Sequence, residues 1–230
     1  FEKHKFKIGV GTNPIFNEVF SRPAAAAKSS MTAIKYLAEN KANKILNFSG
    51  GTHHGRKSFA SGFCFLNDCI LAILKAKQLN FKNILYIDID AHHCDAVQDQ
   101  FVRDDSVKII SIHDKNKWPR TGNLKDCHIS NIMNIPVPEN FNDSEMKFII
   151  DNLIYPFGQN LKPDLVIVQA GSDCLEDDPQ SKMTLTNSSY WSAISKLKSI
   201  SNKTLILGGG GYNPYITAKA WAGNWIVLNS

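Results

Sequence analysis

The stretch from Tyr86 to Asp95 constrains the fold more than any other part of the sequence. It begins inside the segment 83–87, which is aliphatic or aromatic from Ile84 onwards, and within a few residues it supplies three carboxylates and two imidazoles. A near-continuous aliphatic run is typical of a strand covered on both faces, as in a parallel sheet. Because open α/β sheets bind ligands beyond the carboxyl ends of their strands, this strand end is the expected place for a functional site.

Asp90 and His92 lie two residues apart in this stretch, so on an extended backbone their side chains point to the same side. A carboxylate oxygen and an imidazole nitrogen suit zinc, with manganese or iron as the next choices. The alternative is a strand-end aspartate that caps the following helix beside two surface histidines. Carboxylates are rarely tolerated next to so apolar a run unless they are paired or metal-bound, which favours the metal site.

The length and composition predict one α/β domain with a sizeable core, since 43% of the 230 residues are hydrophobic. The net charge of +5 comes mainly from lysines spread thinly along the chain. Without basic blocks or interleaved aromatic residues, this charge gives no indication of direct nucleic-acid binding.

The cysteines and the absence of a long apolar run bear on location. The cysteines are scattered without a CxxC pair, which predicts a reducing compartment and no disulfide framework. They are Cys64, Cys69, Cys94, Cys127 and Cys174. We find no signal peptide and no apolar run of membrane length, so we expect no membrane association and a cytoplasmic location, or a nuclear one in a eukaryote. The sequence does not indicate the oligomeric state.

Alternating strand and helix patterns predict a parallel sheet with helices on both faces. The expected strands are 6–10, 44–48, 83–87, 107–113, 131–137, 165–170 and 203–207. The expected helices are 23–39, 65–79 and 94–101. The long polar stretch 114–130 is predicted to be a functional loop, because long loops inside compact domains are usually functional.

Asp173 follows the expected strand 165–170 and is a candidate third metal ligand beside Asp90 and His92. Three protein ligands leave an open position for water, which is typical of catalytic rather than structural zinc sites. The alternative is that Asp173 only caps a helix.

His53 and His54 follow the expected strand 44–48 in a loop flanked by glycines. An imidazole in this place can hold and deprotonate a water molecule. Each ring needs a partner that fixes its tautomer, and Asp88 and Asp95 are the spare carboxylates of the central stretch. The alternative is a solvent-exposed turn.

Tyr212 follows four consecutive glycines after the last expected strand. Such a turn lets the backbone approach a ligand closely, so the hydroxyl is a candidate donor to a developing oxyanion. A flexible turn followed by a packed tyrosine is equally common, and the motif alone does not decide between the two.

Six segments, in order along most of the chain, together resemble the zinc-dependent histone deacetylase family, including its acetoin-utilisation and acetylpolyamine branches. They are GGTHHG, SGFCFLND, YIDIDAHHCDAV, SIHD, GSDCLEDDP and LGGGGYNP. The resemblance implies the arginase/deacetylase fold, a three-layer α/β/α arrangement around a mostly parallel sheet, with residues 1–230 as a single and partial catalytic domain. It also implies one zinc ion held by Asp90, His92 and Asp173.

The same resemblance implies the roles of the other polar residues of the site. His54, oriented by Asp95, is implied as general base and acid, and His53, oriented by Asp88, as an electrostatic group. Tyr212 is implied to polarise the acetamide carbonyl.

A substrate channel and a second metal are also implied. Gly62 would offer its backbone carbonyl to the substrate amide, and Phe63 with Trp118 would line a narrow channel for an aliphatic stem. A structural potassium ion is implied beside the zinc, with ligands from the backbone of Asp88, Asp90, His92 and Ile112 and from Ser111.

The chain departs from the family pattern at several points. HHCDA replaces the usual HHGDG, so Cys94 and Ala96 stand beside the metal, and we interpret Cys94 as a buried small hydrophobe or an oxidisable neighbour of zinc. Arg120 adds a charge near the channel mouth, and Gln180 stands where relatives often have an apolar rim residue. By comparison, the family's N-terminal segment and last strands and helices are missing, and with them a rim loop that often carries a substrate-binding carboxylate.

The expected activity is hydrolysis of an acetamide, most simply of acetyl-lysine side chains in proteins, with an acetylated protein or a small acetylated amine as partner. An acetylated polyamine is disfavoured because Gln180 is neutral and Arg120 would repel a polycation, although an acidic cluster just before Gln180, residues 176–178, could supply the missing anion. The alternatives from other classes are a dimanganese ureohydrolase, which DAHHCD also resembles, and an inactive acyl-lysine-binding subunit.

Overall fold

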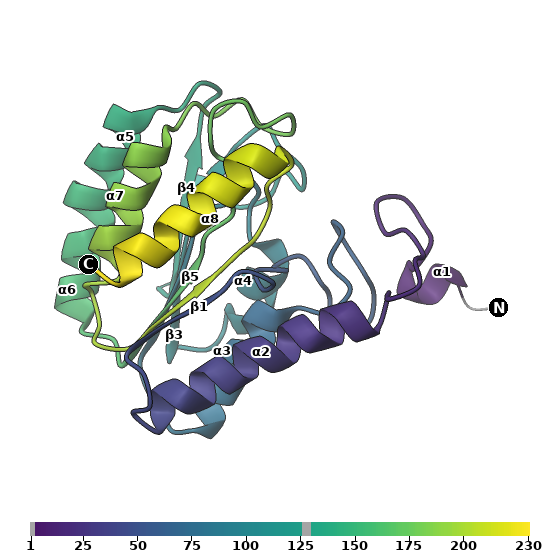
Figure 1. The fold of residues 1–230 in the computed structure, drawn as a ribbon, viewed down its shortest axis with the longest axis horizontal. Coiled ribbons are helices and arrows are strands. Elements are labelled where there is room, and N and C mark those ends of the chain that lie inside the picture. The colour runs from purple at the N-terminus through teal and green to yellow at the C-terminus, as the bar shows by residue number, and fades with distance from the viewer. Residues whose placement is uncertain (1–2, 126–129) are drawn as a thin grey trace.

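A parallel six-stranded sheet forms the centre of the protein in a computed structural model that describes residues 3–125 and 130–230 (Figure 1). The strands lie in the order β1-β6-β5-β2-β3-β4, and every neighbouring pair is parallel. They are β1 (Lys44–Asn47), β2 (Ile84–Asp88), β3 (Val107–Asp114), β4 (Ile132–Val137), β5 (Leu165–Gln169) and β6 (Thr204–Leu207). The predicted parallel sheet is therefore confirmed.

Helices cover both faces of this sheet, which gives three layers (Figure 1). One face carries α2 (Ser21–Ala38), α3 (Asp68–Gln78) and α4 (Asp95–Phe101). The opposite face carries α5 (Asp143–Ile149), the π-helical turn η2 (Ile150–Ile154), α6 (Tyr155–Leu161), α7 (Asn187–Leu197) and α8 (Pro214–Leu228). The short α1 (Lys3–Phe6) lies beyond the N-terminal end of α2. Within the described ranges, no helix is both long and apolar enough to cross a membrane.

The strand β2 (Ile84–Asp88) is aliphatic or aromatic from Ile84 to Ile87 because both of its faces are covered. Leu85 and Ile87 pack into the core beneath α5 to α8, whereas Ile84 and Tyr86 pack into the core beneath α2, α3 and α4. All these side chains are completely buried. Alternate residues of a strand point to opposite faces, so each core takes every second residue.

The predicted strand 6–10 is wrong. The chain leaves α1 at Phe6 and then turns, with positive φ angles of 53° at Lys7 and 75° at Gly9. An extended strand cannot contain these left-handed residues, and Val10 forms only an isolated bridge with Asn13. The other six predicted strands and the three predicted helices are present, with ends within three residues of those expected.

The strand register brings the polar residues together at one edge of the sheet. Asp88 at the end of β2 pairs with Gln169 at the end of β5, and Gln169 pairs with Leu207 at the end of β6. Leu207 in turn pairs with Asn47 at the end of β1. These four strands end level, so the loops that follow them meet at the same edge, as expected for a ligand site in an open α/β sheet.

Candidate metal centre and active site

Asp90, His92 and Asp173 form a group that can hold a metal ion, and their ligand atoms all lie within 4.8 Å of one another. His92 Nδ1 lies 2.9 Å from Asp173 Oδ2 and 3.1 Å from Asp90 Oδ1. Both carboxylates are buried, with exposed fractions of 1% and 0%. The strand ends of β2 and β5 therefore bring together the three side chains that the sequence singled out as ligands.

The residues around this group fit a divalent cation. A Cβ atom on Gly210 would lie 2.2 Å from Asp173 Oδ2, and one on Gly171 would lie 2.1 Å from Asp90 Oδ2, so glycine is required for the backbone to approach so closely. Burial and the charge of Asp90 raise the pKa of Asp173 to about 7. A cation bound between the two carboxylates would relieve this repulsion. Two carboxylates and one imidazole are a donor set that zinc accepts.

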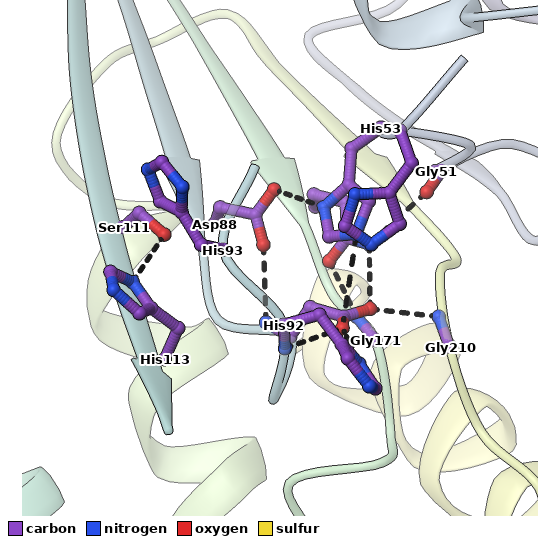
Figure 2. Close-up of polar contacts among 12 residues, drawn as sticks. Gly51, His53, Asp88, His92, His93, Ser111, His113, Gly171 and Gly210 are labelled. Atoms are coloured by element: carbon purple, nitrogen blue, oxygen red, sulfur yellow. Dashed lines mark hydrogen bonds and ion pairs between the residues drawn. The ribbon is translucent and has the colours of Figure 1, made fainter. Parts of the chain in front are cut away.

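Gln169 orients Asp90 and was missed in the sequence. Its Nε2 donates a 2.8 Å hydrogen bond to Asp90 Oδ2, and its Oε1 accepts one of 2.9 Å from the Gly171 N–H. The Gly210 N–H also donates to Asp90 Oδ2, at 2.8 Å (Figure 2). The available signal was one amide at the end of an otherwise aliphatic, fully buried strand. Partners of this kind fix the direction of a metal ligand.

His53 and His54 each donate a hydrogen bond from Nδ1 to a separate carboxylate. His53 bonds Asp88 at 2.8 Å, and His54 bonds Asp95 at 2.8 Å (Figure 2 shows the His53 bond). Asp88 Oδ2 also accepts a 2.6 Å hydrogen bond from the hydroxyl of Tyr86. Both histidines are buried, so the structure places them as tautomer-fixed rings and not in a solvent-exposed turn.

The two imidazoles differ in pKa. Burial would lower the pKa of His53, but the carboxylates of Asp88 and Asp90 raise it to about 9. Burial and the neighbouring charge of His53 lower the pKa of His54 to about 4. At neutral pH the arrangement therefore holds His53 as the cation and His54 as the free base.

Arg56 is a second residue that the sequence analysis missed. Its guanidinium bonds Asp95 Oδ2, the oxygen of that carboxylate that does not bond His54, and it also bonds Asp99. Burial would raise the pKa of Asp95, but His54 and Arg56 lower it, so this carboxylate stays ionised beside the ring that it orients. Arg56 lies two residues after His54, and its position in a polar run gave no signal before the fold was known.

A cavity of about 410 Å³ opens above His54 and His92. The residues expected at the substrate channel and its rim all line it, namely Gly62, Phe63, Trp118 and Gln180. Tyr212, the expected oxyanion donor, lines it as well. The ring of Trp118 lies 4.6 Å from that of His54, and the ring of Phe63 lies 6.2 Å from that of Tyr212. A Cβ atom on Gly62 would lie 2.6 Å from the Trp118 ring, so this wall requires glycine.

The rim of this cavity includes residues from the N-terminal part of the chain. Lys7 and the turn that ends at Asn13 line it, so the chain does supply a rim segment on this side. The Lys7 ammonium lies 4.2 Å from the centroid of the Phe59 ring. Arg120 is exposed and does not line the cavity. Lys7 therefore adds a positively charged residue to the rim, and the charge of Arg120 near the mouth stays a prediction.

Tyr212 remains a neutral hydroxyl donor at ordinary pH. Burial, together with the charges of Asp173 and Asp90, raises its pKa well above the usual value. Its ring is partly exposed and faces the cavity, which fits a group that meets a ligand.

Ser111 and Ile112, the residues implied at a potassium site, are completely buried in β3. Ser111 pairs in register with Asp88, and its hydroxyl lies 2.9 Å from His113 Nδ1 (Figure 2). The potassium site stays a prediction. Cys94 is also completely buried, and burial raises the pKa of its thiol well above the ordinary value, which favours the small hydrophobe over a reactive thiolate. Cys127 lies outside the described residues.

This three-layer architecture, with an aspartate and histidine metal group beyond the ends of parallel strands, defines the arginase/deacetylase class of α/β proteins. The sequence model of the histone deacetylase domain matches residues 2–228. The chain therefore belongs to the histone deacetylase family.

Individual relatives agree with this assignment. Histone deacetylase 8 of Xenopus laevis is 32% identical over 222 residues, which cover 94% of this chain and 68% of the relative. The histone deacetylase RPD3 of Saccharomyces cerevisiae is 30% identical, and the match covers 100% of this chain and 54% of the relative. A solved histone deacetylase (HDAC) homolog complexed with SAHA superimposes with a TM-score of 0.92 at 34% identity over 98% of this chain. An HDAC homolog from Aquifex aeolicus gives a TM-score of 0.90 at 34% identity, and the chain spans 62% of each solved relative.

Proposed function

We propose that the chain is a catalytic domain, partial relative to its family, that hydrolyses an acetamide to acetate and a free amine. The observation that carries this proposal is a convergence at the base of one cavity. The metal group, the carboxylate-bound pair His53 and His54, and Tyr212 come from four different strand ends. His54, His92 and Tyr212 line the substrate cavity and also an adjoining cavity that His53 and Asp90 line. Proton transfer and oxyanion stabilisation require groups in this relation.

Asp90, His92 and Asp173 would hold one zinc ion, which when bound supplies Lewis-acid chemistry that polarises a carbonyl and acidifies water. Gln169 and the Gly210 N–H keep Asp90 aimed at that position. A potassium ion held by the backbone of Asp88, Asp90, His92 and Ile112 with Ser111 is part of the same proposal.

His54 is the proposed general base and acid. Its Nδ1–H is held by Asp95, so Nε2 carries the lone pair, and the lowered pKa keeps that nitrogen unprotonated at neutral pH. It takes a proton from the attacking water and returns it to the leaving amine. His53 stays charged beside it, and Tyr212 donates its hydroxyl hydrogen to the developing oxyanion.

The proposed substrate is an acetyl-lysine side chain in a protein or peptide. Phe63 and Trp118 suit a methylene stem of any acetylated amine. Residues at the rim must therefore discriminate between an acetyl-lysine peptide and an acetylated polyamine. Among the residues that the structure describes, Lys7 is the one lysine, arginine, aspartate or glutamate that lines this cavity. A positive rim favours a peptide over a polyamine, which carries further ammonium groups beyond the stem. The likeness to the homolog complexed with SAHA supports SAHA as a ligand for the same cavity.

The two alternatives from other classes are less well supported. A bridged manganese pair needs more carboxylates, but Asp88 is already bonded to His53 and Tyr86, and the described residues offer one metal group of three side chains. An inactive acyl-lysine binder would not need the proton-transfer residues, yet His54, Asp95 and Tyr212 are all present and positioned.

The test is acetate release from an acetyl-lysine peptide by the zinc-loaded chain. We expect hydrolysis that stops when zinc is removed by a chelator and resumes when zinc is restored. Tight SAHA binding without any acetate release would support the acyl-lysine binder, and urea release from a guanidino compound would support the ureohydrolase.

A further inference from the structure

We infer that Asp178 is a positioning residue that fixes Tyr212 and links it to the rim of the substrate cavity. The inference rests on the proposed deacetylase function, because it assigns Asp178 an effect on the oxyanion donor of that reaction. Asp178 itself does not line the cavity and is not a catalytic residue.

The carboxylate of Asp178 is buried and accepts two backbone hydrogen bonds. Oδ2 accepts the Tyr212 N–H at 2.7 Å, and Oδ1 accepts the Gln180 N–H at 2.8 Å. Only 6% of Asp178 is exposed. Tyr212 and Gln180 both line the cavity, on its base and its rim respectively, so one carboxylate joins two parts of the substrate site that lie 32 residues apart in sequence.

Tyr212 needs such an anchor because the chain before it has little intrinsic rigidity. Gly209 and Gly211 have φ angles of 153° and 150°, which glycine reaches without strain and other residues rarely adopt. Tyr212 as a whole residue is 38% exposed, so packing restrains it incompletely. Its direction therefore depends on where its backbone is held.

The geometry also excludes Asp178 as the rim anion that would bind a polyamine, a role that the sequence left open for residues 176–178. An anion that recognises a polyamine has to point into the rim, but both oxygens of Asp178 are directed at backbone N–H groups. Its neighbour Asp177 is exposed and does not line the cavity. The buried carboxylate therefore holds the loop of Tyr212 and does not bind a substrate cation.

The consequence is a specific kinetic signature. A displaced Tyr212 hydroxyl weakens stabilisation of the transition state, whereas the walls that bind the ground state remain in place. Loss of the anchor should lower kcat and leave KM nearly unchanged.

The test is a double-mutant cycle of Asp178→Asn and Tyr212→Phe, measured on an acetyl-lysine peptide with the zinc-loaded chain. Asparagine keeps the size of the side chain but turns an NH₂ group towards one of the two N–H groups. We expect Asp178→Asn to lower kcat by roughly 10-fold to 100-fold, the cost of a misplacement on the order of 1 Å. In the Tyr212→Phe background the same substitution should change kcat by less than about twofold, since the two residues act as a unit.

Asp177→Asn is the matched control, because it removes the same charge from the same loop at a side chain that makes no hydrogen bond to described residues. It should leave kcat unchanged. A second readout is hydrogen exchange of the Tyr212 amide, which should accelerate by about tenfold or more in Asp178→Asn when its acceptor is weakened.

Three outcomes would each overturn the inference while leaving the deacetylase function intact. They are an equal loss of kcat in both backgrounds, an unchanged kcat in Asp178→Asn, and an unchanged hydrogen-exchange rate of the Tyr212 amide. An unsubstituted chain that releases no acetate would instead overturn the proposed function, and the inference with it.

Discussion

His53 and His54 are adjacent in sequence, and their Nε2 atoms lie 2.9 Å apart while each Nδ1 is bonded to its own carboxylate. Both Nδ1 atoms must donate to those carboxylates, so a hydrogen bond between the Nε2 atoms requires one proton to lie between them. The pair therefore carries one proton more than two neutral rings. The pKa values of about 9 and about 4 place this proton on His53.

The first prediction concerns this shared proton. His53→Asn removes the charge that, after burial, lowers the pKa of His54, so the pKa of His54 should rise from about 4 towards its ordinary value. His54 acts only when deprotonated, so the acid limb of kcat/KM against pH should move to higher pH. The measurement is the pH profile on an acetyl-lysine peptide at equal zinc content. An acid limb that stays in place, or moves to lower pH, contradicts the proposed division of roles.

The second prediction concerns the metal. Elemental analysis should find one zinc ion per chain, and Asp173→Ala should abolish tight binding, because it removes one of the three candidate ligands. Asp105→Ala is a suitable control, since Asp105 is an exposed carboxylate outside the site, and it should retain zinc. Two manganese ions per chain, with urea released from a guanidino substrate, would replace this interpretation by that of a ureohydrolase.

The third prediction concerns Tyr212, whose hydroxyl is proposed to act only when charge develops on the carbonyl oxygen. Tyr212→Phe should leave zinc content and the free energy of unfolding unchanged while lowering kcat by roughly 10²-fold to 10³-fold, the typical loss for one oxyanion donor. Near-normal turnover in this variant would mean that the ring only packs against Phe63.

The sequence revealed the candidate ligands because each directly follows a strong strand pattern. Asp90 and Asp173 come just after β2 and β5, whose residues are all buried, so the change from apolar to acidic was visible without the fold. His53 and His54 were visible for a similar reason, after β1 and between glycines.

The supporting residues were not visible, because their roles arise only from contacts across the fold. Gln169 bonds an aspartate 79 residues away, Arg56 bonds one 39 residues away, and Asp178 bonds a backbone 34 residues away. No local sequence pattern predicts such long-range partners. Residues 6–10 were mistaken for a strand for a related reason. The apolar residues among them do not indicate the left-handed turn that follows α1.

The helices α5, α6, α7 and α8 were assigned no ranges from the sequence, although the alternation of elements required helices on that face. The apolar spacing of the first two is interrupted by the π-helical turn η2, which shifts the helical period. The helix α8 is rich in apolar residues around its whole circumference, so it lacks the one-sided pattern that marks a surface helix.

The last prediction concerns substrate choice, and it depends on the charge at the rim. Lys7 lines the cavity with its ammonium near the Phe59 ring, while Asp178 is turned inward, so a polycation meets repulsion without a compensating anion. We therefore expect a higher kcat/KM for an acetyl-lysine peptide than for N-acetylputrescine. Lys7→Glu should raise kcat/KM for N-acetylputrescine by several-fold, roughly what reversing one partly solvated charge provides.

The control for this change is Lys28→Glu, which makes the same charge reversal at an exposed lysine of α2 that does not line the cavity. It should leave the ratio of the two kcat/KM values unaltered. The effect of Lys7→Glu should also shrink as salt is added, because exposed charges are screened over about 10 Å at 0.1 M ionic strength. Two results would show that the rim charge does not select the substrate. One is a kcat/KM for N-acetylputrescine that is tenfold or more above that for the peptide in the unsubstituted chain, and the other is an equal effect of Lys7→Glu and Lys28→Glu on the ratio of the two kcat/KM values. The preference would then have to arise from the cavity walls.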